Sequence, residues 1–130
     1  MNKKIILIDD DELMVKELSN LLIEEGFDLD AFTDPEIGLD RLLENNYDLL
    51  LLDIKMPKIS GTDILKIARS KGLKTKIITI TGNPIFDSLL DKESLNGATD
   101  KKEVFLADFV LNKPFDPNLL LSKINELITC

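Results

Sequence analysis

Four short apolar runs along the chain each stop at a polar residue. The runs cover residues 5–8, 49–52, 77–80 and 109–112, and the residues that follow them are Asp9, Asp53, Thr81 and Lys113. Apolar runs of this length are typical of buried strands in a parallel sheet. Because the carboxyl ends of parallel strands lie along one edge of a sheet, we expect these four polar residues to meet in one crevice.

Segments with helical spacing separate the runs. Asp11 is placed to cap a first helix, whose inward positions follow the spacing i, i+4, i+7, i+8. Those positions are Met14, Leu18, Leu21 and Leu22. Asp34 and Pro35 are typical of a second helix start, and its inward residues are expected to be Leu39, Leu42 and Leu43. A third helix is expected from Thr62, and a weakly alternating stretch at 27–32 predicts one more strand.

Five strands alternate with five helical stretches, and we count the whole of residues 1–130 as one domain. With right-handed crossovers, this alternation predicts an α/β fold with a doubly wound parallel sheet and helices on both faces. The pattern is weakest between residues 83 and 107, where the expected strands four and five are far apart. We interpret that segment as a helix, a loop, and a second short helix or irregular piece.

Composition excludes several classes of chemistry. The 130 residues contain no histidine and one cysteine, Cys130, so Ser-His and Cys-His nucleophiles and histidine metal sites are excluded. The net charge of −8 argues against nucleic-acid binding, which needs a basic face. The sequence shows neither an apolar run long enough to span a membrane nor a secretory signal, and we expect a cytoplasmic protein.

The expected convergence of Asp9, Asp10 and Asp53 points to a cation site. Two carboxylates about 4 Å apart repel by roughly 4 kcal/mol at an effective dielectric constant of about 20. A hard cation such as Mg²⁺ relieves this repulsion, and it binds through one or two carboxylates while it coordinates phosphate oxygens. Lys113 adds a second positive charge, so a carboxylate here could attack a phosphoryl group and form an acyl phosphate.

Each residue also has a purely structural explanation when it is taken alone. An Asp after a strand is often a helix cap, which is the favoured reading of Asp11. Thr81 is an ordinary β-branched strand residue, and a Lys-Pro pair in a loop such as Lys113-Pro114 is uninformative by itself. Their joint placement at the expected strand ends is what favours phosphoryl chemistry over these explanations.

In this pattern the chain resembles a response-regulator receiver domain, the phosphoacceptor module of two-component signalling. The motifs that carry the resemblance are Ile-Leu-Ile-Asp-Asp-Asp-Glu at 6–12, Leu-Leu-Asp-Ile-Lys-Met-Pro-Lys-Ile-Ser-Gly at 51–61, Ile-Thr-Gly at 80–82 and Lys-Pro-Phe at 113–115. The resemblance implies a flavodoxin-like fold with strand order 2-1-3-4-5. It also implies a phosphorylation-controlled switch rather than an enzyme with a substrate pool.

The resemblance assigns roles to the site residues. It makes Asp53 the phosphoacceptor and Mg²⁺ the cofactor, with Asp10, Asp53 and the backbone carbonyl of Lys55 as ligands and Asp9 acting through water. Thr81 becomes the switch hydroxyl. Lys113 becomes the phosphate-pairing lysine, in a cis bond to the following proline. The implied partners are a sensor histidine kinase or phosphotransfer protein and an output domain or downstream protein; direct nucleic-acid or membrane binding by this domain is not expected.

Three features depart from the usual pattern of that family. Val110 stands where a Tyr or Phe is usual, and Phe109 is expected to point to the other face of the strand. Thr81 and Lys113 are 32 positions apart, which is longer than usual. Lys55 lies two residues after the expected phosphoacceptor, and we hypothesise that its ammonium shields the phosphoryl group or competes with Mg²⁺.

Two alternatives remain open on the sequence alone. A haloacid-dehalogenase-like phosphatase would use Asp9 as nucleophile and Asp11 as general acid, with Thr81 and Lys113 in its later motifs. Leu13 is unusual for that family, and Asp53 would then have no role. The second alternative is a receiver-like binding module that does not take phosphate.

Overall fold

The computed structural model describes residues 3–56, 58–81 and 106–128. The strands in this part of the chain are β1 (Lys4–Ile8), β2 (Asp28–Phe32), β3 (Leu49–Asp53), β4 (Lys76–Thr81) and β5 (Phe109–Asn112). The helices in it are α1 (Glu12–Glu24), α2 (Pro35–Glu44), α3 (Gly61–Ser70) and α6 (Pro117–Ile128).

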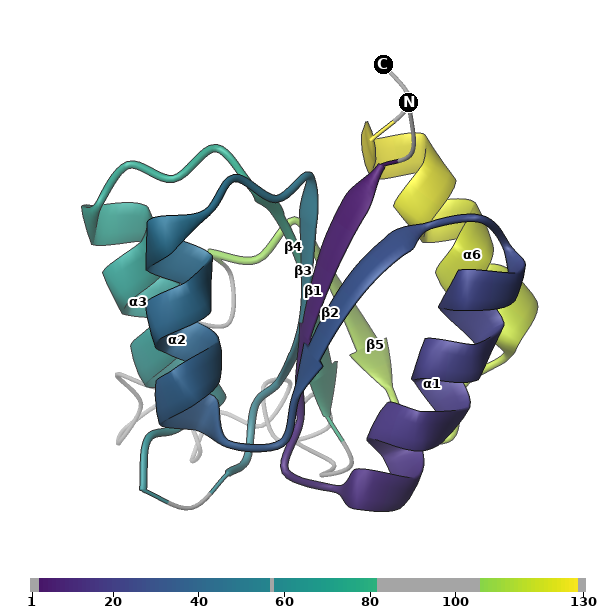
Figure 1. Ribbon diagram of the computed structural model, residues 1–130, viewed down its shortest axis with the longest axis horizontal. Helices are drawn as coiled ribbons and strands as arrows, with labels where there is room; N and C mark the ends of the chain where they lie inside the picture. The colour runs from purple at the N-terminus through teal and green to yellow at the C-terminus, as the bar shows by residue number, and fades with distance from the viewer. Residues whose placement is uncertain (1–2, 57, 82–105, 129–130) are drawn as a thin grey trace, which may run out of the picture.

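All neighbouring strands pair in parallel, in the order β2-β1-β3-β4-β5. Figure 1 shows α1 and α6 on one face of the sheet and α2 and α3 on the other. The predicted doubly wound α/β fold and its strand order are therefore confirmed. Of the segment 83–107, where a further helical stretch is expected, residues 83–105 lie outside the described part of the chain.

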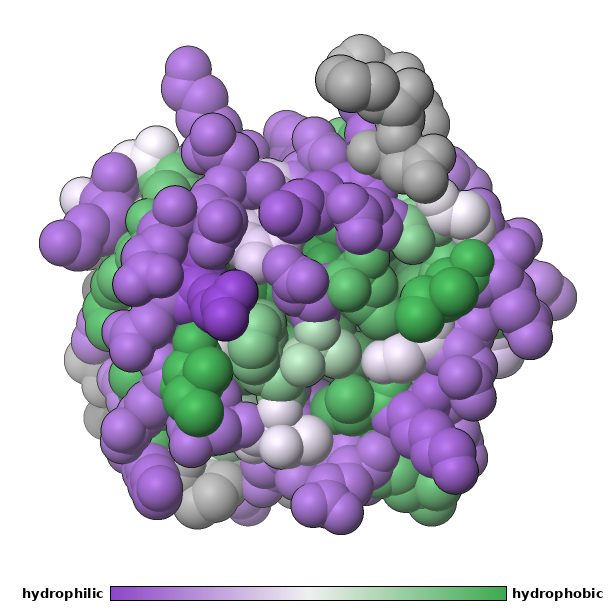
Figure 2. All heavy atoms as spheres, in the orientation of Figure 1, coloured by the Kyte–Doolittle hydropathy of each residue, from purple (hydrophilic) through white to green (hydrophobic). Residues whose placement is uncertain are grey.

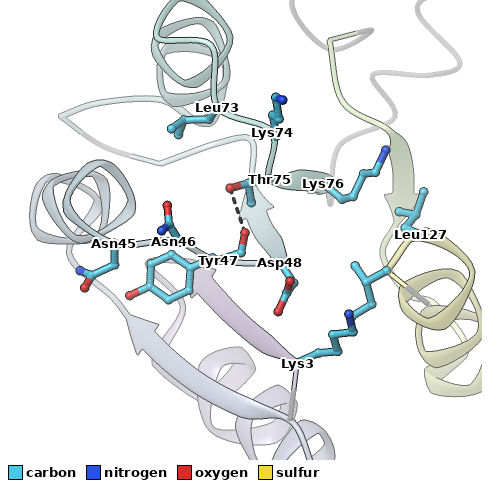
Figure 3. A pocket seen from close by; sticks show the side chains of 11 residues that line it. Lys3, Asn45, Asn46, Tyr47, Asp48, Leu73, Lys74, Thr75, Lys76 and Leu127 are labelled. Atoms are coloured by element: carbon cyan, nitrogen blue, oxygen red, sulfur yellow. Dashed lines mark hydrogen bonds between the residues drawn. The ribbon is translucent and has the colours of Figure 1, made fainter. Parts of the chain in front are cut away.

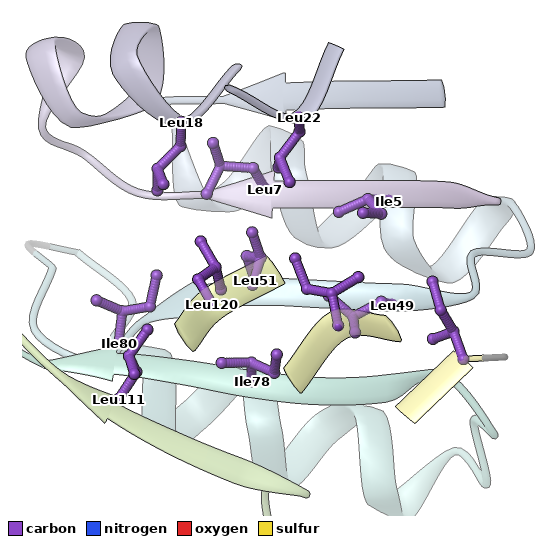
Figure 4. Packing of buried hydrophobic residues seen from close by; sticks show 12 residues of the cluster. Ile5, Leu7, Leu18, Leu22, Leu49, Leu51, Ile78, Ile80, Leu111 and Leu120 are labelled. Atoms are coloured by element: carbon purple, nitrogen blue, oxygen red, sulfur yellow. The ribbon is translucent and has the colours of Figure 1, made fainter. Parts of the chain in front are cut away.

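The sheet separates two apolar layers, because successive residues of a strand face opposite sides. In β1, Ile5 and Leu7 join the layer under α1 and α6, whereas Ile6 and Ile8 join the layer under α2 and α3. Figure 4 shows the first layer, with Leu18 and Leu22 of α1 packed over the strands. All five residues of β3 are buried, which explains why four leucines in a row precede Asp53.

The helix starts agree with the expected caps. Asp11 accepts hydrogen bonds from the N–H groups of Leu13 and Met14, and Asp34 caps α2 with Pro35 in its first turn. Helix α3 begins at Gly61, one residue earlier than expected, because the Ser60 hydroxyl caps it.

The prediction for Leu43 is wrong. Its side chain is 37% exposed, whereas Leu42 is buried and Leu39 packs against the second apolar layer. A helix turns about 100° per residue, so the residue after Leu42 leaves the narrow stripe that α2 presents to the sheet.

The face of the molecule in Figure 2 is mostly hydrophilic, interrupted by smaller apolar patches. Large exposed apolar side chains include Leu13 and Ile23 on α1 and Ile37 on α2. Within the described residues, the helices are all too short or too polar to cross a bilayer.

Candidate functional site

Three carboxylates meet at the carboxyl edge of the sheet. Asp9 follows β1 directly, Asp10 comes next, and Asp53 is the last residue of the neighbouring strand β3. One oxygen from each of the three lies within 4.8 Å of the others. The parallel pairing of β1 with β3 produces this cluster, because it ends both strands at the same level.

The Asp9 carboxylate is completely buried and only partly satisfied. Its Oδ1 accepts a hydrogen bond from the Asp11 N–H at 3.0 Å. Its Oδ2 has no hydrogen-bond partner among the described residues and lies 3.6 Å from Lys113 Nζ. An orphaned buried oxygen beside two further carboxylates matches the oxygen ligands that Mg²⁺ prefers, so these residues fit a divalent cation.

Asp53 is 6% exposed, and its surroundings disfavour its charged form. Burial raises the pKa of the Asp53 carboxyl to about 7, and the charge of Asp9 adds to the rise. The ammonium of Lys113 and a backbone hydrogen bond from Lys55 lower that pKa, but to a smaller extent. In the absence of a cation, the cluster therefore holds a carboxylate that takes up a proton near neutral pH.

Lys113 reaches the acids from the far side of β4. Its N–H donates to the Thr81 carbonyl at 2.8 Å, and the Lys113-Pro114 peptide bond is cis, as the resemblance implied. Thr81 is buried at the end of β4 and pairs with Asn112. The structure thus brings Asp9, Asp10, Asp53 and Lys113 together, with Thr81 at the end of the next strand.

The structure also describes two of the departures from the usual family pattern. The side chain of Lys55 is exposed, and the orientation of its carbonyl toward a metal stays a prediction. Phe109 packs in the α1–α6 layer together with Leu111, and Val110, between them in the strand, pairs with Thr79. Since alternate strand residues face opposite sides, the aromatic ring is on the other face from the position of Val110, as expected.

Gly61, which the sequence presents only as the last residue of the motif at 51–61, is a site residue whose role the sequence did not reveal. Its N–H donates to the Ile54 carbonyl at 2.8 Å. A Cβ at this position would lie 2.6 Å from Ile54 Cα and closer still to the Asp53 carbonyl oxygen. The glycine therefore lets the start of α3 pack against the backbone that carries the Asp53 carboxylate.

A hollow of about 390 Å³ lies at the opposite, amino end of the sheet. Lys3, Lys74 and Lys76 are among its lining residues, and Figure 3 shows their side chains extending apart rather than toward a common point. The Thr75 hydroxyl donates to the Tyr47 carbonyl at 3.1 Å, so this contact joins two loops. The carboxylate cluster, whose charged groups do converge, is the better candidate for chemistry.

Comparison with known proteins identifies what the chain is similar to. The family model for the response regulator receiver domain matches residues 5–125. The transcriptional regulatory protein DltR of Streptococcus agalactiae is 34% identical over 121 residues, which cover 93% of this chain and 50% of that protein. The chain thus spans about half the length of this curated relative.

Solved structures agree with the sequence comparison. A CheY-like receiver domain protein from Methanospirillum hungatei matches with a TM-score of 0.81 and 28% identity, covering 99% of this chain and 95% of that one. The response regulator TrrA of Thermotoga maritima, solved in complex with Mg²⁺ and BeF, matches with a TM-score of 0.79 and 31% identity, covering 96% and 98%. The phosphatase alternative finds no support, because the match over most of the chain is to receiver domains.

Proposed function

The chain belongs to the response regulator receiver family, and we propose that it is a phosphoacceptor signalling switch in which Asp53 takes the phosphoryl group. The observation that carries the proposal is the cluster of three carboxylates within 4.8 Å, with Lys113 Nζ 3.6 Å from Asp9. Among these acids, Asp53 ends the central strand β3, between β1 and β4. Groups from both neighbouring strands therefore flank it.

The proposed reaction is a phosphoryl transfer from a phosphohistidine. An Asp53 oxygen attacks the phosphorus, the P–N bond breaks, and its electron pair stays with the imidazole nitrogen, which then takes a proton. Later, water attacks the same phosphorus, and the Asp53 carboxylate leaves as inorganic phosphate forms. The protein catalyses only these steps on itself, which fits a signalling module rather than an enzyme with a substrate pool.

Asp9, Asp10, Asp53 and the backbone carbonyl of Lys55 would hold Mg²⁺, with Asp9 acting through water. The ion supplies positive charge that screens the carboxylates from the incoming phosphoryl group. Lys113 supplies a second positive charge from the protein itself. Its ammonium lies 3.6 Å from the buried Asp9 carboxylate and would pair with a phosphoryl oxygen on Asp53.

Phosphorylation would then shift the domain between two arrangements. The aspartyl phosphate carries a charge of about −1.5 to −2 and three acceptor oxygens, which Thr81 and Lys113 can meet. The proposed phosphodonor is a sensor histidine kinase or a phosphotransfer protein, and the readout is an output domain or a downstream protein. The domain assignment for 1–130 and a cytoplasmic location stay predictions from the sequence.

Lys55 is proposed to tune the lifetime of the phosphoryl group. Lys55 follows the proposed phosphoacceptor by two residues, and its side chain is exposed. Its ammonium would shield the phosphorus from water or compete with Mg²⁺. We expect Lys55→Ala to change the lifetime of the aspartyl phosphate in a decay assay. An unchanged lifetime would remove this role.

The test of the main proposal is intact-mass spectrometry after incubation with acetyl phosphate and Mg²⁺. Wild type should gain one phosphoryl group, and Asp53→Asn should not. Asp40→Asn, which removes an exposed carboxylate from α2, is the matched control and should be modified like wild type. An unmodified wild type would instead favour the binding module that does not take phosphate.

A further inference from the structure

Asp108, the residue before β5, forms two hydrogen bonds with a single residue of β4. Its N–H donates to the Ile77 carbonyl at 2.8 Å. Its carboxylate Oδ2 accepts from the Ile77 N–H, also at 2.8 Å. Together these bonds specify which residue of β4 stands opposite the point where the chain enters β5.

Arg69, in the last turn of α3, holds the Asp108 carboxylate. Its Nη2 lies 3.0 Å from Asp108 Oδ2, and its Nε donates to the Leu106 carbonyl at 3.0 Å. Its Nη1 donates to the carbonyls of Leu73 and Thr75, each at 3.3 Å. One planar guanidinium therefore joins the end of α3, the connection to β4 and the entry to β5.

Strand β5 has fewer buried side chains to fix its register than β3 has. It is a four-residue edge strand, and of these residues Leu111 is the one that is buried. Strand β3, by contrast, has five buried residues and a neighbour on each side. Burial determines the register of a strand only where many of its side chains must face the core. The register of β5 therefore depends on polar contacts more than that of β3 does.

The register of β5 sets the position of Lys113, which follows the strand directly. A slip by one residue would move Lys113 by about 3.3 Å along the sheet and turn its side chain to the other face. The 3.6 Å approach of its Nζ to Asp9 would then be lost. We propose that Asp108 and Arg69 are positioning residues that form a register lock for Lys113; the inference rests on the proposed function, in which Lys113 pairs with the phosphoryl group.

The chain offers a matched control at the start of β3. Asp48 precedes β3 as Asp108 precedes β5, its N–H donates to the Lys4 carbonyl at 2.8 Å, and its Oδ2 accepts from the Lys4 N–H at 2.8 Å. The local geometry is the same, but the strand that follows is fixed by its buried residues. Loss of the Asp48 side chain should therefore cost one hydrogen bond without moving a strand.

The experiment compares Asp108→Ala, Asp108→Asn and Asp48→Ala with wild type by amide hydrogen exchange and by NMR titration. In Asp108→Ala, the protection of the Lys113 amide should fall about tenfold or more, since a hydrogen bond to a charged group is lost. Asp108→Asn keeps a side-chain oxygen that can accept from the Ile77 N–H. Its Lys113 protection should therefore lie between that of wild type and that of Asp108→Ala. Asp48→Ala should leave Lys113 protection within about threefold of wild type.

The second readout separates positioning from general loosening. Beryllofluoride, a phosphoryl mimic, should bind Asp108→Ala in the presence of Mg²⁺ about tenfold more weakly than wild type. The affinity for Mg²⁺ alone should not fall, because the acids at the ends of β1 and β3 stay in place and lose only the repulsive charge of Lys113 beside them. If Asp108→Ala does not fold, Arg69→Lys supplies the same test with a smaller effect in the same direction.

Unchanged Lys113 protection in Asp108→Ala would overturn the inference, and so would an equal loss in Asp48→Ala. A parallel loss of Mg²⁺ affinity would also overturn it, because the effect would then not be specific to Lys113. Failure of wild type to bind beryllofluoride would count against the proposed function instead, while the exchange data would still decide whether Asp108 sets the register.

Discussion

Replacing Asp53 with Asn should stabilise the metal-free protein, and by more at higher pH. The pKa of this carboxyl is 3.8 in the unfolded reference and about 7 in the folded state. The folded state therefore keeps a proton that the unfolded state has already lost, and the free energy of unfolding falls as pH rises between these two values. Asn cannot ionise, so Asp53→Asn should lack this part of the pH dependence.

The size of the effect follows from the pKa shift. About three pKa units at 1.36 kcal/mol each give roughly 4 kcal/mol as a ceiling. The free-energy cost of ionising Asp53 in the folded state is absent below about pH 4 and is present in full above about pH 7. We therefore expect Asp53→Asn and wild type to be similarly stable near pH 4, and the variant to be more stable by about 2–4 kcal/mol near pH 8.

The assay is urea unfolding followed by far-UV circular dichroism in the presence of EDTA, since the chain has no tryptophan to report by fluorescence. Asp40→Asn removes an exposed carboxylate and should follow the wild-type pH profile. Mg²⁺ at ten times its dissociation constant should stabilise wild type by about 1.4 kcal/mol and Asp53→Asn by less. The reasoning is refuted if, without metal, the stability of wild type relative to Asp53→Asn stays flat or rises between about pH 4 and pH 8.

Three further substitutions test the packing around the site by urea unfolding. Gly61→Ala should destabilise the fold by about 1–3 kcal/mol or more, since a Cβ would clash with the backbone of Asp53 and Ile54. An unchanged urea midpoint would show that α3 can shift to make room for the Cβ. Thr79→Val should stabilise the fold by about 1 kcal/mol, because the buried Thr79 hydroxyl has no hydrogen-bond partner among the described residues. A loss of stability would reveal a partner for that hydroxyl. Tyr47→Phe should destabilise by about 1 kcal/mol through loss of the 2.6 Å hydrogen bond to Asp30, and an equal stability would mean that water replaces that bond at no cost.

Much of the fold could be predicted because local patterns carried the information. The apolar runs predicted the strands, and the alternation of strands with helical segments predicted a parallel sheet with helices on both faces. The caps at Asp11 and Asp34 are local effects as well, since each side chain bonds N–H groups two and three residues away. Leu43 shows the limit, because helical spacing alone does not say how wide a stripe of α2 meets the sheet.

What only the tertiary structure decided are the contacts between residues distant in sequence. The sequence alone gave no signal that Gly61 packs against the backbone of Asp53, or that Arg69 and Asp108, 39 positions apart, join α3 to β5. The sequence predicted that Asp9 and Asp53 converge, but the size of the rise in the pKa of Asp53 depends on the burial and the separation that only the packed structure shows. Residue types and their spacing determine which elements form, but close approach and low exposure arise only when those elements pack, because both depend on distances that the order of residues does not contain.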